Sequence, residues 1–281
     1  MDNPAYVLGH SEQELQRLRR QARLIEPATR LFLEESGVGA GMRVLDVGSG
    51  AGDVAFLVGG LVGETGEVIG TDRAPAAVAA ASARVREQGL RNVSFRKGDP
   101  AHMRFDRPFD AVIGRYVLLF QSDAVGMVRR LLQHLRPGGL ALFHEPDWQS
   151  ARSIPSGSTY DSCCRWIQQT FARAGTDSNM AGTLYRTLVG AGLSTPTMRM
   201  RTFIGGGAQC ADYLQAVADL VGSMLPSIVE YGVASAAEVD QANLAERMQQ
   251  ETISGGSVII GRSEIGAWAR LPAGPESKLC G

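Results

Sequence analysis

The chain has 281 residues, a hydrophobic share of 44% and a formal net charge of −1. This length suits one large α/β domain with insertions, or a domain with a cap. No apolar run approaches the ~18 residues of a membrane-spanning helix, and a charge near zero offers no basic field for nucleic acid. Composition therefore predicts a globular protein that binds neither a membrane nor a nucleic acid.

The start of the chain and its cysteines both point to the cytoplasm. Residues 1–4 show no basic region followed by an apolar core, so no signal peptide is expected. The four cysteines match no metal-ligand spacing, and a vicinal pair rarely forms a disulfide. We therefore expect free thiols in a reducing compartment. These cysteines are Cys163, Cys164, Cys210 and Cys280.

The first part of the chain is predicted to form a helical arm. Apolar residues between Leu15 and Ile25 recur at helical spacing, and Ser11 with Glu14 matches a capping box. Pro27 is expected to break this helix and to start a second one over residues 28–35.

A glycine-rich turn follows the first predicted strand. Residues 42–47 form an apolar run typical of a buried strand, and a helix is expected over residues 54–62. The turn between them allows backbone N–H groups to approach a ligand closely. A dinucleotide site has the pattern G-x-G-x-x-G, but here the third glycine comes one residue early, at Gly52, and Asp53 stands in the expected place.

Four more predicted strands follow at the spacing of parallel strands joined by crossover segments. The second strand ends in Asp72, 26 residues after Asp46, and a carboxylate there can accept hydrogen bonds from both hydroxyls of a ribose. The third strand is followed by Gly98-Asp99-Pro100, and a Pro-Gly-Gly turn precedes the fifth. The segments that contain these strands are 68–72, 92–96, 109–116 and 135–143.

The pattern beyond residue 150 is less regular. Residues 150–158 are polar and predict turns, and Gly205–Gly207 predict a hinge-like break. Residues 257–269 are expected to close the sheet as an antiparallel strand, and residues 272–281 to be a disordered tail. Helices are predicted over 160–174, 180–192, 210–225 and 236–250, and a strand over 195–204.

These motifs, in this order and at this spacing, resemble the class I S-adenosylmethionine-dependent methyltransferases. The G-x-G-x-G turn two residues after Asp46 resembles motif I of that family, and residues 135–143 resemble its post-motif segment. The resemblance implies an α/β fold, a Rossmann-like seven-stranded sheet with helices on both faces, an antiparallel strand seven and helical lid insertions. The implied parts are an arm (1–36), a cofactor-binding core (37–147), the remaining sheet with substrate-lid helices (148–271) and the tail (272–281).

The resemblance implies that S-adenosylmethionine is the cofactor. In the family, an acid at the position of Asp72 binds the ribose, an acid at the position of Asp99 holds the adenine amino group, and the arm closes over the methionine end. The expected cofactor-binding residues are Tyr6, Gln21, Asp46, Gly48, Ser49, Gly50, Gly52, Asp72, Arg73, Gly98, Asp99, Pro100, Arg115 and Tyr116.

Candidate catalytic residues stand at the carboxyl end of the fifth strand, where ligands bind in such sheets. Glu145 is favoured as the residue that contacts the acceptor or its charge, with His144 as the alternative base, because adjacent strand residues face opposite ways. Tyr160 is a third candidate, from the lid. The alternatives remain that Glu145 pairs with Arg115 or with an arginine of the lid, and that His144 is only a hydrogen-bonded polar residue.

Absent motifs narrow the acceptor class. The chain has no Asn-Pro-Pro-Tyr after the fourth strand, no Pro-Cys dipeptide, and no terminal acids of the kind that metal-dependent catechol enzymes carry on that strand. The leading hypothesis is therefore a metal-free methyl transfer to an apolar small molecule in specialised, natural-product metabolism. An NAD(P)-dependent oxidoreductase and a non-catalytic cofactor-binding protein are kept as alternatives, and assembly into a homo-oligomer is left open.

Overall fold

The structure, a computed structural model, describes the course of residues 12–273 and the side chains of residues 24–273. Eight strands form one sheet in the order β3-β2-β1-β4-β5-β8-β6, with β7 paired to the other edge of β8. The pairs among β1 to β5 are parallel, whereas β8 is antiparallel to β5, β6 and β7. The strands are β1 (Arg43–Val47), β2 (Glu67–Asp72), β3 (Val93–Lys97), β4 (Phe109–Arg115), β5 (Leu135–Asp147), β6 (Arg152–Ile154), β7 (Thr197–Gly206) and β8 (Val258–Arg270).

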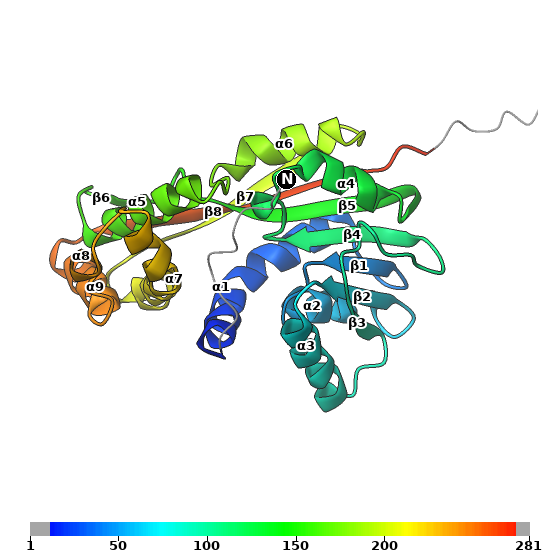
Figure 1. Ribbon diagram of the computed structural model, residues 1–281, viewed down its shortest axis with the longest axis horizontal. Helices are drawn as coiled ribbons and strands as arrows, with labels where there is room; N and C mark the ends of the chain where they lie inside the picture. Colours follow the sequence, from blue (N-terminus) through cyan, green and yellow to red (C-terminus); the bar gives the residue numbers. More distant parts are fainter. Residues whose placement is uncertain (1–11, 274–281) are drawn as a thin grey trace, which may run out of the picture.

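Helices cover both faces of the sheet, as predicted (Figure 1). On one face, α1 and α2 contribute to a buried cluster with β1, β2 and β4, and on the other face α4 and α6 do so with β4 and β5. The helices are α1 (Glu12–Ser36), α2 (Asp53–Val62), α3 (Pro75–Gln88), α4 (Ala124–Leu132), α5 (Thr159–Arg173), α6 (Met180–Gly190), α7 (Ala211–Glu230), α8 (Ala236–Val239) and α9 (Leu244–Ser254).

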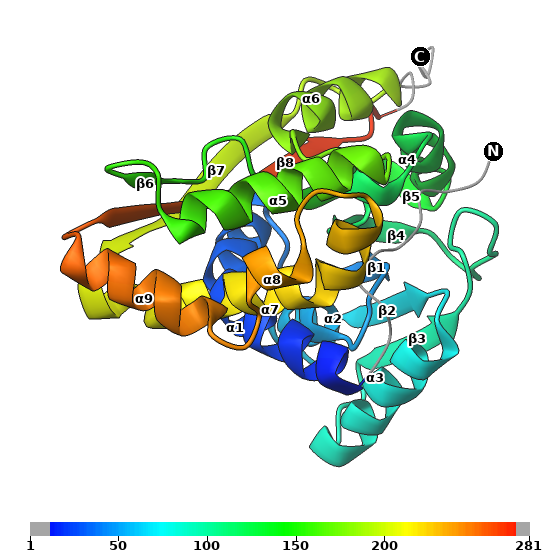
Figure 2. The same cartoon turned by 60° about the vertical axis from the view of Figure 1, so that its left-hand side comes forward.

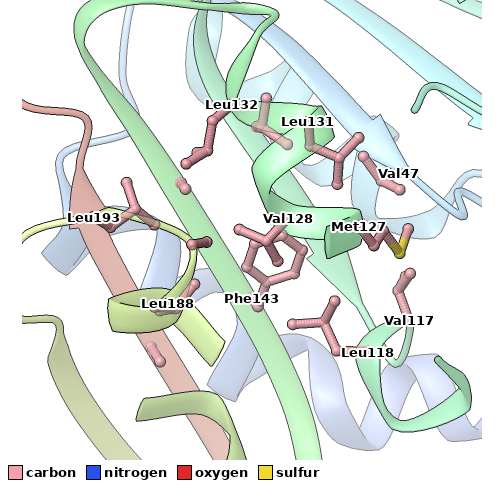
Figure 3. Packing of buried hydrophobic residues seen from close by; sticks show 14 of the residues in the cluster. Val47, Val117, Leu118, Met127, Val128, Leu131, Leu132, Phe143, Leu188 and Leu193 are labelled. Carbon is pink, nitrogen blue, oxygen red and sulfur yellow. The ribbon is translucent and has the colours of Figure 1, made fainter. Parts of the chain in front are cut away.

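The α4–α6 face shows how this layering is stabilised. Phe143 of β5 packs among Val128 and Leu131 of α4 and Leu188 of α6, and all four side chains are fully buried (Figure 3). Each such side chain contributes roughly 1.5–3 kcal/mol on burial. This packing holds α4 and α6 firmly against β4 and β5.

A second group of helices, α5, α7, α8 and α9, gathers at one end of the molecule beyond the parallel strands (Figures 1 and 2). Its buried cluster joins Tyr160 and Ile167 of α5 to Leu214 of α7 and Met248 of α9. Helix α1 also contacts α7, so α1 lies between this helical group and the parallel strands.

The predicted fold class is confirmed, with an antiparallel strand at the predicted place, but the sheet has eight strands instead of seven. The extra strand, β6, lies in the segment predicted as turns. It is only three residues long and pairs with Val258–Ile260, about a hundred residues away in sequence, so no local pattern indicates it. The predicted break at Gly205 is also wrong, because Gly205 and Gly206 pair with β8 as part of β7.

Two helix boundaries differ from the predictions because tertiary packing outweighs local signals. Pro27 does not break the arm, and α1 runs continuously from Glu12 to Ser36. An internal proline costs about 3 kcal/mol, whereas the burial of Ile25, Phe32 and Leu33 along this helix contributes roughly 1.5–3 kcal/mol for each side chain. The helix predicted over 236–250 is divided, since Asp240 has a φ of 47° and ends α8 before α9 begins.

Candidate active site

The glycine turn after β1 has one glycine that faces open space and two that are needed for packing. Gly48, Gly50 and Gly52 all have positive φ, at 65°, 52° and 92°. A Cβ on Gly48 would lie 2.9 Å from Val117, and one on Gly52 would lie 2.6 Å from Phe95. No heavy atom lies within 4 Å of the position of a Cβ on Gly50. The turn therefore leaves room for a ligand against the backbone at Gly50.

Asp72, at the end of β2, borders this open space. Its Oδ2 accepts a hydrogen bond of 2.9 Å from the Gly50 N–H, and its Oδ1 accepts one of 2.8 Å from the Ala74 N–H. The carboxylate is only partly buried. Because each carboxylate oxygen can accept more than one hydrogen bond, Asp72 keeps acceptor capacity for ligand hydroxyls.

Two buried polar residues lie at the glycine turn: Asp46 in β1 and Ser49 in the turn itself. Burial raises the pKa of Asp46 from 3.8 to about 7, although the nearby charge of Arg115 lowers it. Among the residues described, Asp46 Oδ2 and the Ser49 hydroxyl have no hydrogen-bond partner. Unsatisfied buried polar atoms beside the open space at Gly50 are consistent with a polar ligand at this turn.

Asp99, in the segment after β3, contacts Arg73, which directly follows β2. Arg73 donates a hydrogen bond of 2.5 Å to Asp99, and the Ala101 N–H and His102 Nδ1 lie 3.0 Å and 3.2 Å from the same carboxylate. Burial would raise the pKa of Asp99, but these hydrogen bonds and the charge of Arg73 lower it below its ordinary value. The structure thus brings together two of the predicted cofactor residues, with Gly98 and Pro100 flanking Asp99.

The end of β4 carries Arg115 and Tyr116. Tyr116 has a φ of 59°, a left-handed conformation that costs a non-glycine residue about 1–2 kcal/mol and that occurs preferentially at functional sites. This backbone directs the Tyr116 hydroxyl to Glu264 Oε2, to which it donates a hydrogen bond of 2.6 Å. Arg115 donates instead to the Thr29 hydroxyl of α1, at 3.1 Å.

A buried network links these groups to β5 and β8. His144 is fully buried, with Nε2 2.9 Å from Glu264 Oε2 and Nδ1 3.2 Å from the Thr29 hydroxyl. Arg262 donates to Glu264 Oε1 at 2.9 Å. Burial alone would raise the pKa of Glu264, but Arg262 and the hydrogen bonds hold it at about 2, while burial lowers the pKa of His144. The network therefore contains an ionised glutamate and a neutral histidine at neutral pH.

Two members of the network, Arg262 and Glu264, line a cavity of about 460 Å³ that lies between α1, α7, β7 and β8. This volume is within the range of about 300–1,000 Å³ of pockets that hold small molecules. Glu264 and Arg262 line the cavity from β8, and apolar side chains of α1 and α7 such as Ile25 and Leu220 line it from the other side. Arg262 lies over the rings of Tyr116 and Trp148, at 5.4 Å and 5.3 Å from their centroids.

Glu145, favoured from sequence for contact with the acceptor, does not line this cavity. Its carboxylate is fully buried and accepts hydrogen bonds from the N–H groups of Val117 (2.9 Å) and Leu118 (2.7 Å), at the start of the 3₁₀ helix Leu118–Phe120. The alternative pairing with Arg115 is not formed either. His144 does not line the cavity either, but its Nε2 contacts Glu264, which does.

Tyr160 lies behind the cavity wall. It is buried, and its hydroxyl donates to the Ile260 carbonyl at 2.9 Å and lies 3.4 Å from the hydroxyl of Tyr213, which does line the cavity. Tyr6 and the side chain of Gln21 lie outside the described residues. Three of the cysteines, Cys163, Cys164 and Cys210, are free and buried, and Cys280 also lies outside the described part.

Four residues of the site were missed from sequence: Thr29, Tyr213, Arg262 and Glu264. A signal for two of them existed, because Arg262 and Glu264 interrupt the strand that was predicted to close the sheet, and buried charges require partners. Thr29 and Tyr213 lie on helices where one polar residue carries no such signal. Among residues 24–273, no cluster of three or more His, Cys, Asp or Glu side chains is suited to hold a metal ion.

We expect Glu145→Gln to change the pH dependence of stability. Burial raises the pKa of Glu145 from 4.5 to about 8, so in the wild type its ionisation opposes folding as the pH rises from about 4.5 to about 8. Relative to the wild type, the variant should gain on the order of a few kcal/mol over this interval and change little below it. Urea unfolding at pH 5 and pH 9 measures the difference. Parallel stability curves for the two proteins would contradict the prediction, whereas turnover should be largely retained because Glu145 is outside the cavity.

Comparison with known proteins decides the family. A model described as a methyltransferase domain matches residues 39–186, which is more than half of the chain. The chain belongs to this methyltransferase domain family. The matched residues include the glycine turn, Asp72, Asp99 and His144. The resemblance seen in the sequence is therefore confirmed for residues 39–186.

Named relatives match over shorter stretches. The aklanonic acid methyltransferase DauC of Streptomyces sp. strain C5 is 38% identical over 121 residues, which are 43% of this chain and 55% of the relative. The 2-phytyl-1,4-naphtoquinone methyltransferase of Synechococcus elongatus is 37% identical over 114 residues, 40% of this chain and 49% of the relative. The chain thus spans about half the length of these curated relatives.

Solved structures share the fold over most of the chain. The YcgJ protein of Bacillus subtilis has a TM-score of 0.58 and 20% identity, over 87% of this chain and 99% of that one. Geranyl diphosphate C-methyltransferase from Streptomyces coelicolor has a TM-score of 0.54 and 15% identity, over 93% and 85%. The [4+2]-cyclase SpnF also has a TM-score of 0.54, at 23% identity over 88% and 82%. At these identities the likeness concerns the fold alone.

Within residues 12–273, none of the helices is both long and apolar enough to cross a membrane.

Proposed function

We propose that this protein is an S-adenosylmethionine-dependent methyltransferase that methylates an apolar small molecule. The observation that carries the proposal is the open space at Gly50 beside the Asp72 carboxylate, in a chain of the methyltransferase domain family. When bound, S-adenosylmethionine supplies a methyl group that its sulfonium has already activated. The residues of this chain then have to bind the two reactants, align them and exclude water.

In this proposal the cofactor lies along the carboxyl ends of β1, β2 and β3. Asp72 binds the ribose hydroxyls, and the Arg73–Asp99 pair borders the adenine. The Asp46 and Ser49 atoms that lack protein partners are available to the polar methionine end. The arm (1–36) covers the reactants, and the substrate-lid part is contributed by residues 148–271.

The acceptor binds in the cavity between α1, α7, β7 and β8. Its apolar walls favour an apolar molecule, and Glu264 and Arg262, which Tyr116 and His144 hold in place through Glu264, offer fixed polar groups that orient it. Glu264 is a weak base because its pKa is about 2, so acceleration comes mainly from alignment and desolvation. Names such as aklanonic acid and naphtoquinone methyltransferase among the relatives support an acceptor from specialised metabolism. We place the reaction in the cytoplasm as part of the same proposal.

Calorimetry distinguishes this proposal from the oxidoreductase alternative. We expect the protein to bind S-adenosylhomocysteine and not NADH. Tight NADH binding without S-adenosylhomocysteine binding would refute the proposal. Release of labelled methyl from S-adenosylmethionine to a panel of apolar acceptors then separates an enzyme from a non-catalytic cofactor-binding protein.

Asp72→Ala should weaken S-adenosylhomocysteine binding by roughly 10²-fold or more. It removes two hydrogen bonds to a charged acceptor, each worth about 1.5–3 kcal/mol. Asp110→Ala is the matched control, because Asp110 also accepts a backbone N–H, that of Arg43 at 2.7 Å, but stands near the opposite end of the parallel strands. Isothermal titration of both variants checks the prediction. Equal dissociation constants for the wild type and Asp72→Ala would remove Asp72 from the cofactor site.

A further inference from the structure

The wall of the acceptor cavity contains an arginine without an assigned partner. Arg201 lines the cavity from β7, and its Cα pairs in register with that of Glu264 on β8. Side chains paired in this way across antiparallel strands project from the same face of a sheet. With the side chains of residues 24–273, Arg201 forms no ion pair or hydrogen bond in the structure.

Glu264, the nearest carboxylate across the strands, is already engaged. Its Oε1 accepts from Arg262, and its Oε2 lies within hydrogen-bond distance of the Tyr116 hydroxyl and His144 Nε2. The charged side chains that line the cavity are therefore two arginines and one glutamate, of which Arg262 and Glu264 neutralise each other. The unbalanced positive charge belongs to Arg201.

Arg199, a second exposed arginine of β7, has partners within the protein. It stands two residues before Arg201 on the same strand, so its side chain projects from the same face. It forms a salt bridge of 2.7 Å to Glu35 at the end of α1, and its guanidinium lies 5.8 Å from the centroid of the Trp268 ring. Arg199 is thus held by the protein, whereas Arg201 is exposed, lines the cavity and has no such partner among residues 24–273.

We propose that the acceptor is an apolar molecule that carries an anionic oxygen group, such as a carboxylate, and that Arg201 binds this group. This inference rests on the proposed function, because it identifies the class of molecule that enters the same site. The planar guanidinium matches two oxygens of one anion, and the apolar walls of Ile25, Ala28 and Leu220 bind the rest of the molecule. Arg201 acts as a specificity-determining residue and takes no part in methyl transfer.

The test uses two probes of nearly the same shape, one anionic and one neutral. Anthracene-2-carboxylate and the neutral anthracene-2-carboxamide are titrated by fluorescence anisotropy into protein saturated with S-adenosylhomocysteine. We expect the wild type to bind the carboxylate about tenfold more tightly, the lower end for a charge-assisted hydrogen bond because Arg201 is exposed to solvent on one side. The preference should shrink as salt is added, because salt screens a partly exposed pair.

Two variants test whether Arg201 causes the preference for the carboxylate probe. Arg201→Gln should bind both probes with equal affinity and leave the affinity for the carboxamide unchanged. Arg199→Gln removes the same charge from the same strand and should keep the tenfold preference. The inference is overturned by equal affinity of the wild type for the two probes, by a preference that survives in Arg201→Gln, or by no binding of either probe up to about 1 mM. Failure of the proposed function is distinct from these outcomes, because it appears as absent S-adenosylhomocysteine binding.

Discussion

Replacing Gly50 with valine is expected to abolish S-adenosylhomocysteine binding, with a loss of more than about 10³-fold in affinity. The three valine carbons would occupy the space that the structure leaves open against the backbone of the turn. Gly50 has a φ of 52°, so a β-branched residue there also adds about 1–2 kcal/mol of backbone strain. The binding defect must therefore be separated from a folding defect.

Gly89→Val is the matched control. Gly89 ends α3 with a φ of 64° and likewise has no heavy atom within 4 Å of the position of its Cβ. Both variants should show a similar fall in melting temperature, and Gly50→Val alone should lose binding by calorimetry. Retained binding in Gly50→Val would mean that the turn is only a structural link between β1 and α2. Equal loss of binding in both variants would attribute the effect to strain.

Glu264→Ala should destabilise the protein by about 3–5 kcal/mol, because it leaves the buried charge of Arg262 without its partner. It also leaves Tyr116 and His144 without their acceptor. Glu264→Gln keeps the shape and one acceptor oxygen and should lose less. Urea unfolding at pH 7 measures both variants. As a control, Glu35→Ala removes the partly exposed partner of Arg199 and should cost less than about 1 kcal/mol.

The same glutamate should produce a defined acid sensitivity. Its pKa in the folded protein is about 2, below the ordinary value of 4.5, so its ionised form stabilises the fold at every pH above about 4.5. This contribution is lost as the pH falls from about 4.5 to about 2. The stability difference between the wild type and Glu264→Gln should therefore narrow over that interval. A constant difference down to pH 2 would mean that the charge of Glu264 contributes nothing.

Local patterns were sufficient to predict the half of the molecule that binds the cofactor. The strand, the glycine turn and the acid that ends β2 lie within 31 residues, and each is set by a short-range requirement such as the positive φ of Gly48. The resemblance to the methyltransferase family adds the order of the strands. Glycine spacing alone could not distinguish Gly50, which faces open space, from Gly52, which packs against Phe95.

The proposed acceptor site was much harder to predict because its parts come from distant segments. Tyr116 and Glu264 are 148 residues apart in sequence, and Thr29 and His144 are 115 apart. Which of His144 and Glu145 reaches Glu264 depends on the register of β5 against β8, which sets the side of the sheet for each residue. The sequence alone does not show this register.

The cavity described above takes its walls from α1, α7, β7, β8 and Trp148, and none from β1, β2 or β3 and the turns that follow them. Substitutions in these walls can therefore change which molecule fits without altering the nucleotide-facing half. The hydrogen bond from Arg115 to Thr29 is one connection between the two halves that such changes would have to preserve. For the proposed function, this separation would let the acceptor preference change through cavity-lining side chains of α1 and α7 while the turns after β1, β2 and β3 stay constant.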